Sequence, residues 1–146
     1  MAAPIRAEAV RIFLAEERAR GWNPTEIRVA TQEKRLGCDV LSVPPEGGEP
    51  HPVEVKGWGE AFLSVSSGRF VYHQDIRTSQ MEAAMRDPNY RVEIVANLTA
   101  YLAGRGSYER LTLTADEVCE RAVPRLYDVP LAGLEQRIRR EGTNPA

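Results

Sequence analysis

Two short apolar segments, separated by a loop rich in proline and glycine, constrain the fold more than any other feature of this chain. Residues 38–43 (CDVLSV) and residues 52–56 (PVEVK) have the composition and alternation of β-strands. Residues 44–50 between them contain three prolines and two glycines, which cannot continue a ladder of strand hydrogen bonds. The sequence therefore predicts a hairpin in which the two segments pair with each other.

Helices and further strands are expected on both sides of this hairpin. Gly21 ends a first amphipathic helix, while Ser79 with Glu82 and Thr114 with Glu117 match the capping box that opens a helix. The expected helices span residues 5–20, about 80–86, the stretch after Thr114 that stops before Pro124, and about 131–141. The expected strands span residues 26–31, 61–65, 69–73 and 90–98, with a polar turn at 32–37. This order predicts an α/β (α+β) domain with a mixed central sheet flanked by helices.

Composition excludes several classes of protein. No apolar run approaches the roughly 18–20 residues that cross a bilayer, and the charged N-terminal segment lacks the apolar core of a signal peptide, so we expect no membrane partner and a cytoplasmic location. Two cysteines without short spacing and only two histidines argue against a disulfide scaffold, a zinc cage and a multi-histidine centre. A net charge of −2 argues against indiscriminate coating of nucleic acid, but it is compatible with a nucleic-acid enzyme.

The predicted hairpin carries the residues that indicate chemistry. Glu54 and Lys56 point to one face of their strand, and Asp39 on the preceding strand can lie beside Glu54. Two carboxylates aimed at one point repel each other unless they share a cation, and carboxylate and carbonyl oxygens suit Mg²⁺ or Mn²⁺. Lys56 is one of only two lysines beside 17 arginines. Its compact ammonium could orient a water molecule or neutralise charge on a phosphate.

The segments 37–40 (GCDV) and 53–57 (VEVKG) resemble the motif of the PD-(D/E)XK nucleases, which have the restriction-endonuclease-like fold. The pattern is most similar to the NO VEIN C-terminal-like and Mrr-like branches. Glu8 is similar to the glutamate of the family's first helix, and Gln80 stands where the helix after the motif often carries a glutamate. The resemblance covers about residues 5–98. The chain lacks the Gln-x-x-x-Tyr pattern of the exonuclease branch, because the position four residues after Gln80 holds Ala84. This departure favours an endonuclease.

This resemblance implies a Mg²⁺-dependent (or Mn²⁺-dependent) nuclease that hydrolyses DNA in restriction, defence or repair, with a homodimer as a plausible assembly. The length of the chain predicts one domain over residues 1–146, with the core that the resemblance covers at about 5–98 and a helical extension at about 99–146. The metal ligands that the resemblance implies are Asp39, Glu54, the Val55 carbonyl and Glu8, and the catalytic residues are Asp39, Glu54, Lys56 and Gln80. Candidate contacts to the phosphate backbone are Lys34, Arg35, Arg69 and Arg77.

Other interpretations of these residues stay open at this point. Asp39 and Glu54 could be surface carboxylates paired with Arg28 or Arg35, because charge pairs across strands are common. Lys56 could form a surface pair with Glu54 or Glu60, and Glu8 could be a solvated first-turn glutamate. The chain could also be a non-catalytic module of the same fold that binds DNA or a protein, or an unrelated α/β binding protein.

Overall fold

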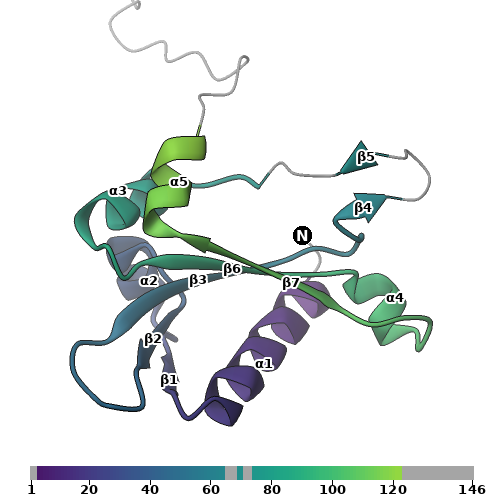
Figure 1. Cartoon of the computed structure of the whole chain (residues 1–146), viewed down its shortest axis with the longest axis horizontal. Coiled ribbons are helices and arrows are strands. Elements are labelled where there is room, and N and C mark those ends of the chain that lie inside the picture. The colour runs from purple at the N-terminus through teal and green to yellow at the C-terminus, as the bar shows by residue number, and fades with distance from the viewer. Residues whose placement is uncertain (1–2, 65–68, 71–73, 123–146) are drawn as a thin grey trace, which may run out of the picture.

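The computed structural model describes residues 3–64, 69–70 and 74–122, which form a five-stranded mixed sheet between helices (Figure 1). The order of strands across this sheet is β1-β2-β3-β6-β7, and β4 pairs with β5 in a separate two-stranded ribbon. The strands are β1 (Asn23–Glu26), β2 (Val40–Val43), β3 (His51–Gly57), β4 (Leu63–Ser64), β5 (Arg69–Phe70), β6 (Arg91–Ala96) and β7 (Glu109–Thr114). The helices are α1 (Ala3–Ala19), α2 (Ala30–Leu36), α3 (Thr78–Arg86), α4 (Leu98–Leu102) and α5 (Ala115–Arg121).

The expected hairpin is confirmed, because β2 and β3 are antiparallel neighbours with Val40 opposite Val53. β1 pairs antiparallel with the outer edge of β2. The chain then crosses over through α3 and returns as β6, which lies parallel to β3 with Glu54 opposite Val92. The fold class is thus a mixed α+β arrangement with helices on the sheet, as the sequence predicts.

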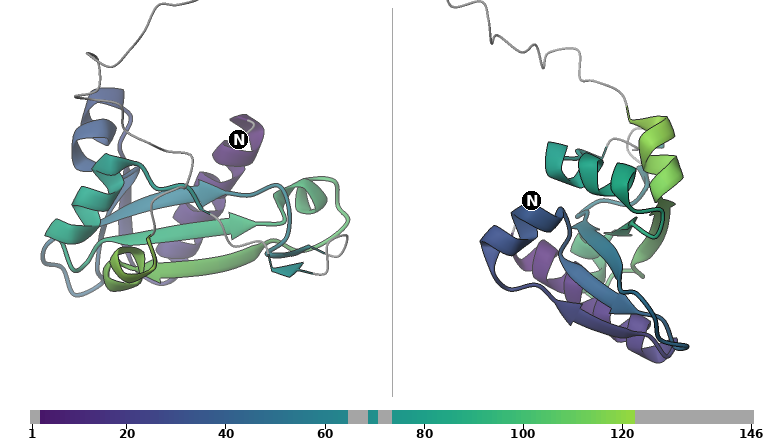
Figure 2. Two further views of the ribbon diagram at one scale, coloured as in Figure 1. Left: turned by 90° about the horizontal axis from the view of Figure 1, so that it is seen from above. Right: turned by 90° about the vertical axis from the view of Figure 1, so that its left-hand side faces the viewer.

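Helices cover both faces of the sheet, and each face has its own apolar core (Figure 2). On one face, Phe13 and Ile12 of α1 pack against Val53 and Val55 of β3. On the other face, α3 and α5 pack against side chains of β6 such as Ile94. Because strand side chains alternate, Glu54 and Lys56 point away from α1 and towards the layer of α3.

The segment before the hairpin differs from its expected structure. Residues 26–31 are expected as a strand and 32–37 as a turn, whereas β1 ends at Glu26 and residues 30–36 form α2. The residues of α2 (ATQEKRL) are mostly good helix formers, and Gly37 ends the helix in the left-handed region with φ +68°. A Cβ atom at Gly37 would lie 2.3 Å from the Ser79 carbonyl oxygen, so glycine also permits the close approach of α3.

The C-terminal part of the fold also differs. Residues 99–146 are expected as a helical extension, but β7 forms the edge strand of the main sheet. Its side chains are largely exposed, which explains its weak apolar signal. The helix expected at 131–141 and most of the strand expected at 69–73 lie outside the described residues. None of the described helices is long and apolar enough to cross a membrane.

The two capping boxes have different outcomes. The box of Thr114 and Glu117 is confirmed at the start of α5, where Thr114 Oγ1 accepts the Glu117 N–H at 3.2 Å. The box expected from Ser79 and Glu82 is wrong, since α3 begins at Thr78 and is capped from Arg77. There, Gln80 Oε1 accepts the backbone N–H of Arg77 at 2.9 Å.

Candidate functional site

Asp39 lies where β2 begins, and the backbone around it is fixed from both sides. Its N–H donates to the Val53 carbonyl at 2.9 Å, and its own carbonyl accepts the Ile27 N–H at 2.8 Å. Its side-chain Oδ2 accepts the backbone N–H of Val55 at 2.9 Å. These bonds hold a carboxylate that is almost fully buried against the neighbouring strand. The structure therefore does not pair Asp39 with Arg28 or Arg35 at the surface, which was one of the alternatives that the sequence left open.

Glu54 and Lys56 form a buried ion pair on β3. Lys56 Nζ lies 3.1 Å from Glu54 Oε2, and the two side chains are only 15% and 7% exposed. A lysine that is buried to this extent is uncommon and is held by a charge partner. The pair with Glu54 that we considered from the sequence is thus present, but it lies inside the molecule.

Gln80 brings α3 into contact with this ion pair. Lys56 Nζ donates to Gln80 Oε1 at 3.3 Å, and the same oxygen accepts the N–H of Arg77. A single buried amide therefore both caps the helix and positions the ammonium. The structure brings Lys56, Glu54 and Gln80 together, as the motif resemblance implies.

Burial and like charge make Glu54 an unusual carboxyl group. Burial raises its pKa to about 7, with a further contribution from the charge of Asp39, while Lys56 acts in the opposite direction. Burial also raises the pKa of the neighbouring Cys38 thiol to about 12, and both acids add to this effect. Glu54 therefore loses its proton less readily than an ordinary glutamate, mainly because it is buried and partly because Asp39 is close.

Two further residues contact the cluster, and sequence reasoning missed both. Arg6, in the first part of α1, places Nη2 at 3.2 Å from Asp39 Oδ1 and also at 3.2 Å from Glu33 Oε2. Burial raises the pKa of Glu33, and Asp39 raises it further. The sequence does contain a signal for the helix that carries Glu33, because residues 30–36 have helical composition and Gly37 is a typical helix end. Nothing local in the sequence indicates that Arg6 contacts Asp39.

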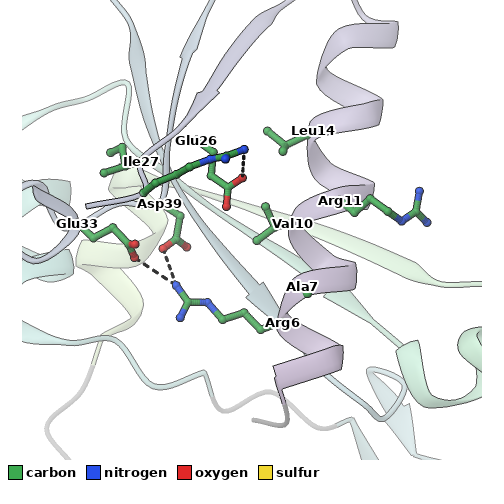
Figure 3. A pocket seen from close by; sticks show the side chains of 10 residues that line it. Arg6, Ala7, Val10, Arg11, Leu14, Glu26, Ile27, Glu33 and Asp39 are labelled. Atoms are coloured by element: carbon green, nitrogen blue, oxygen red, sulfur yellow. Dashed lines mark hydrogen bonds and ion pairs between the residues drawn. The ribbon is translucent and has the colours of Figure 1, made fainter. Parts of the chain in front are cut away.

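A cavity of about 660 Å³ lies between α1 and the segment formed by β1 and α2 (Figure 3). Val10 and Leu14 of α1 line one side, and Ile27 lines the other. Asp39 forms part of the cavity wall, and the guanidinium of Arg6 is directed towards Asp39. The cavity thus gives access to the Asp39 end of the cluster.

In the described part of the chain, the side chains of the remaining candidate residues form no ion pair with Asp39 or Glu54, although the backbone N–H of Arg77 contacts Gln80. Glu8 pairs with Arg11 on α1, so the structure does not bring it to Asp39 or Glu54. Lys34 and Arg35 are exposed in the last turn of α2, and Arg77 is exposed at the start of α3. The side chain of Arg69 lies outside the described residues.

The donor set is suited to a hard cation. Asp39 and Glu54 supply buried carboxylates whose mutual repulsion a divalent ion would relieve, and the Val55 carbonyl directly follows Glu54 in the chain. In the described part of the chain, no group of three or more histidine, cysteine, aspartate or glutamate side chains is arranged to hold a metal ion.

No family model, curated protein or solved structure matches this chain.

Proposed function

We propose that this protein is a divalent-metal-dependent nuclease of the PD-(D/E)XK type that hydrolyses DNA phosphodiester bonds. The observation that carries the proposal is the buried cluster of Asp39, Glu54 and Lys56, in which two carboxylates and an ammonium converge on one hairpin. Support also comes from Gln80, which contacts Lys56 from α3. A structural ion pair alone needs only one carboxylate, whereas here Asp39 acts on the pair of Glu54 and Lys56 as a second carboxylate and raises the pKa of Glu54 further.

In this proposal the carboxylates of Asp39 and Glu54 and the Val55 carbonyl hold a Mg²⁺ or Mn²⁺ ion. When bound, the ion supplies Lewis acidity to the scissile phosphate and lowers the pKa of a coordinated water. Lys56 orients the attacking water and compensates charge that develops on the phosphate oxygens. Gln80 fixes the direction of the Lys56 ammonium, while the backbone N–H of Val55 fixes Asp39.

The substrate in this proposal is DNA in the interior of the cell, in restriction, defence or repair. Exposed basic residues on α2 and α3, namely Lys34, Arg35 and Arg77, are available to contact the phosphate backbone. A homodimer would place two such sites on the two strands of a duplex. Glu8 has no part in this proposal, because it is directed to Arg11.

Cleavage assays test this proposal directly. Purified protein is incubated with duplex, single-stranded and branched DNA in Mg²⁺, Mn²⁺ or EDTA, beside Asp39→Asn and Lys56→Ala. Cleavage is expected for the wild type with metal, and both variants should lose about 10²-fold or more in rate. Arg105→Ala, which changes an exposed residue after α4, is the matched control and should retain activity. Metal-dependent cleavage that survives in both site variants would contradict the proposal.

A second candidate function is favoured by the two contacts of the Asp39 side chain. Both oxygens of Asp39 already have protein partners, Arg6 and the Val55 N–H, as expected if the motif only stabilises the fold. The chain would then be a non-catalytic module that binds DNA or a protein. Wild-type protein that binds DNA but cuts none of the substrates with either metal would favour this module.

A further inference from the structure

We propose that Arg6 is an internal counter-ion, which pairs with Asp39 where the divalent cation would otherwise bind. Glu33 holds Arg6 at this position, and binding of the cation releases Arg6. This inference rests on the proposed function, because it assumes that Asp39 is a metal ligand. It adds a residue from α1 that the motif does not contain.

Arg6 contacts both of its carboxylate partners through a single nitrogen atom. A guanidinium normally pairs with a carboxylate through two parallel N–H groups, whereas here a single nitrogen, Nη2, serves carboxylates from two different elements. The distances to Asp39 Oδ1 and Glu33 Oε2 are both 3.2 Å. One cationic atom between two carboxylates is also the arrangement that a bound cation would produce.

The burial of the partners is asymmetric. The Asp39 side chain is 8% exposed, while the side chains of Glu33 and Arg6 are 29% and 53% exposed. Asp39 is fixed by the Val55 N–H, but Arg6 is held mainly by its head group and can turn into solvent. Displacement of Arg6 therefore moves a half-exposed side chain and leaves the core packing in place, while a bound cation would compensate the charge of Asp39 instead.

The other arginines at the cavity differ from Arg6. Arg11 pairs with Glu8 and points away from the cavity, and Arg28 is 85% exposed and lies 4.0 Å from Glu26 (Figure 3). Arg6 is the arginine of this cavity that contacts Asp39. Once released, its guanidinium would stay at the cavity mouth, where it could bind a substrate phosphate. Metal loading would thereby free a phosphate ligand beside the metal.

Direct measurement of Mn²⁺ binding, without nucleic acid and at fixed pH and ionic strength, tests this inference. Titration calorimetry or the electron paramagnetic resonance signal of free Mn²⁺ gives the dissociation constant. Arg6→Ala is expected to bind Mn²⁺ about 5-fold more tightly than the wild type, because the competing ion pair is gone. Arg18→Ala, an exposed arginine on the same helix, should bind Mn²⁺ as the wild type does.

Glu33→Gln tests the holding role. If Glu33 only retains Arg6 at Asp39, its substitution should also tighten Mn²⁺ binding. Weaker binding would make Glu33 a metal ligand and would overturn its assigned role.

Failure of the inference differs from failure of the proposed function. Equal or weaker Mn²⁺ binding in Arg6→Ala, with binding in the wild type that Asp39→Asn abolishes, overturns only the role of Arg6. Absence of binding in wild type and Arg6→Ala alike, or binding that is unchanged in Asp39→Asn, overturns both proposals.

Discussion

In the part of the chain that the structure describes, carboxylates are buried in two places, and their charge partners differ. One is the candidate site of Asp39 and Glu54, with the cations Arg6 and Lys56. The other, here called the arginine network, lies on the α1 face of the sheet and joins Glu17 of α1 to β6 and β7. Its members are Glu16, Glu17, Arg20, Ser42, Arg91, Glu93, Arg110 and Thr112.

The arginine network compensates its carboxylates almost completely. Glu93 accepts from Arg91 at 2.9 Å, from Arg110 at 2.6 Å and from Thr112 at 2.8 Å. Arg91 also donates to Glu17 at 2.6 Å. Although burial alone raises the pKa of Glu17, hydrogen bonds from partners such as Ser42 and Arg91 more than offset it, and its pKa is lowered.

The candidate site shows the opposite balance. Its carboxylates act on each other, the pKa of Glu54 is raised to about 7, and its buried cation is one of only two lysines in a chain with 17 arginines. In the network, three carboxylates (Glu16, Glu17 and Glu93) pair with three arginines (Arg20, Arg91 and Arg110), whereas at the site three carboxylates (Asp39, Glu54 and Glu33) share two cations (Arg6 and Lys56). The proposed function starts from this difference, because a divalent cation would compensate the additional carboxylate at the site.

The largest effect on stability is expected in the arginine network. Arg91→Ala removes ion pairs with both Glu17 and Glu93, and it should lower the free energy of unfolding by about 3–5 kcal/mol, as for one partner lost from a buried pair. Urea unfolding measures this change. Arg28→Ala, at an exposed position, should change it by less than about 0.5 kcal/mol. A loss below about 1 kcal/mol in Arg91→Ala would contradict a structural role for the network.

Substitution of Lys56, the lysine cation at the site, should change the cleavage rate more than the affinity for DNA. Lys56→Arg keeps the charge but replaces a compact ammonium with a larger planar group that cannot give up its proton. We expect the single-turnover cleavage rate to fall by about 10²-fold, while DNA affinity stays within a few fold of the wild type. Gel-based kinetics and a binding titration measure the two quantities. An unchanged cleavage rate would mean that Lys56 acts only as a positive charge.

The pH dependence of stability should also separate the two regions. Because the pKa of Glu54 is raised from 4.5 to about 7 in the folded protein, its protonated form stabilises the fold below pH 4.5, and this contribution is lost as pH rises through 7. Without divalent metal, the unfolding free energy of the wild type should therefore fall by about 1–3 kcal/mol relative to Glu54→Gln between pH 5 and 8. Parallel curves for the two proteins would contradict the raised pKa.

Local sequence patterns predicted the part of the fold that carries the motif. The β2–β3 hairpin follows from alternation and from the proline-rich loop, and alternation also places Glu54 and Lys56 on one face. The position of Gln80 came from the motif resemblance. The contact of Arg6 with Asp39 could not be predicted, because it depends on how α1 packs across the sheet.

Elements whose local signal is weak or ambiguous were harder to predict. Residues 30–36 form α2, but the alternation of residues 26–31 predicts a strand and the polar residues 32–37 predict a turn. β7 alternates apolar and polar residues, yet it is an exposed edge strand whose stability depends on pairing with β6.

The most direct test of the account compares how Mn²⁺ changes the thermal stability of variants in the two regions. Wild-type protein and Glu16→Gln, from the arginine network, should show the same rise in Tm with added Mn²⁺, because a ligand that binds only the folded state stabilises it. Asp39→Asn should show little or no rise. An equal rise in Asp39→Asn would place the ion elsewhere, and no rise in the wild type would contradict the claim that the site binds a divalent cation.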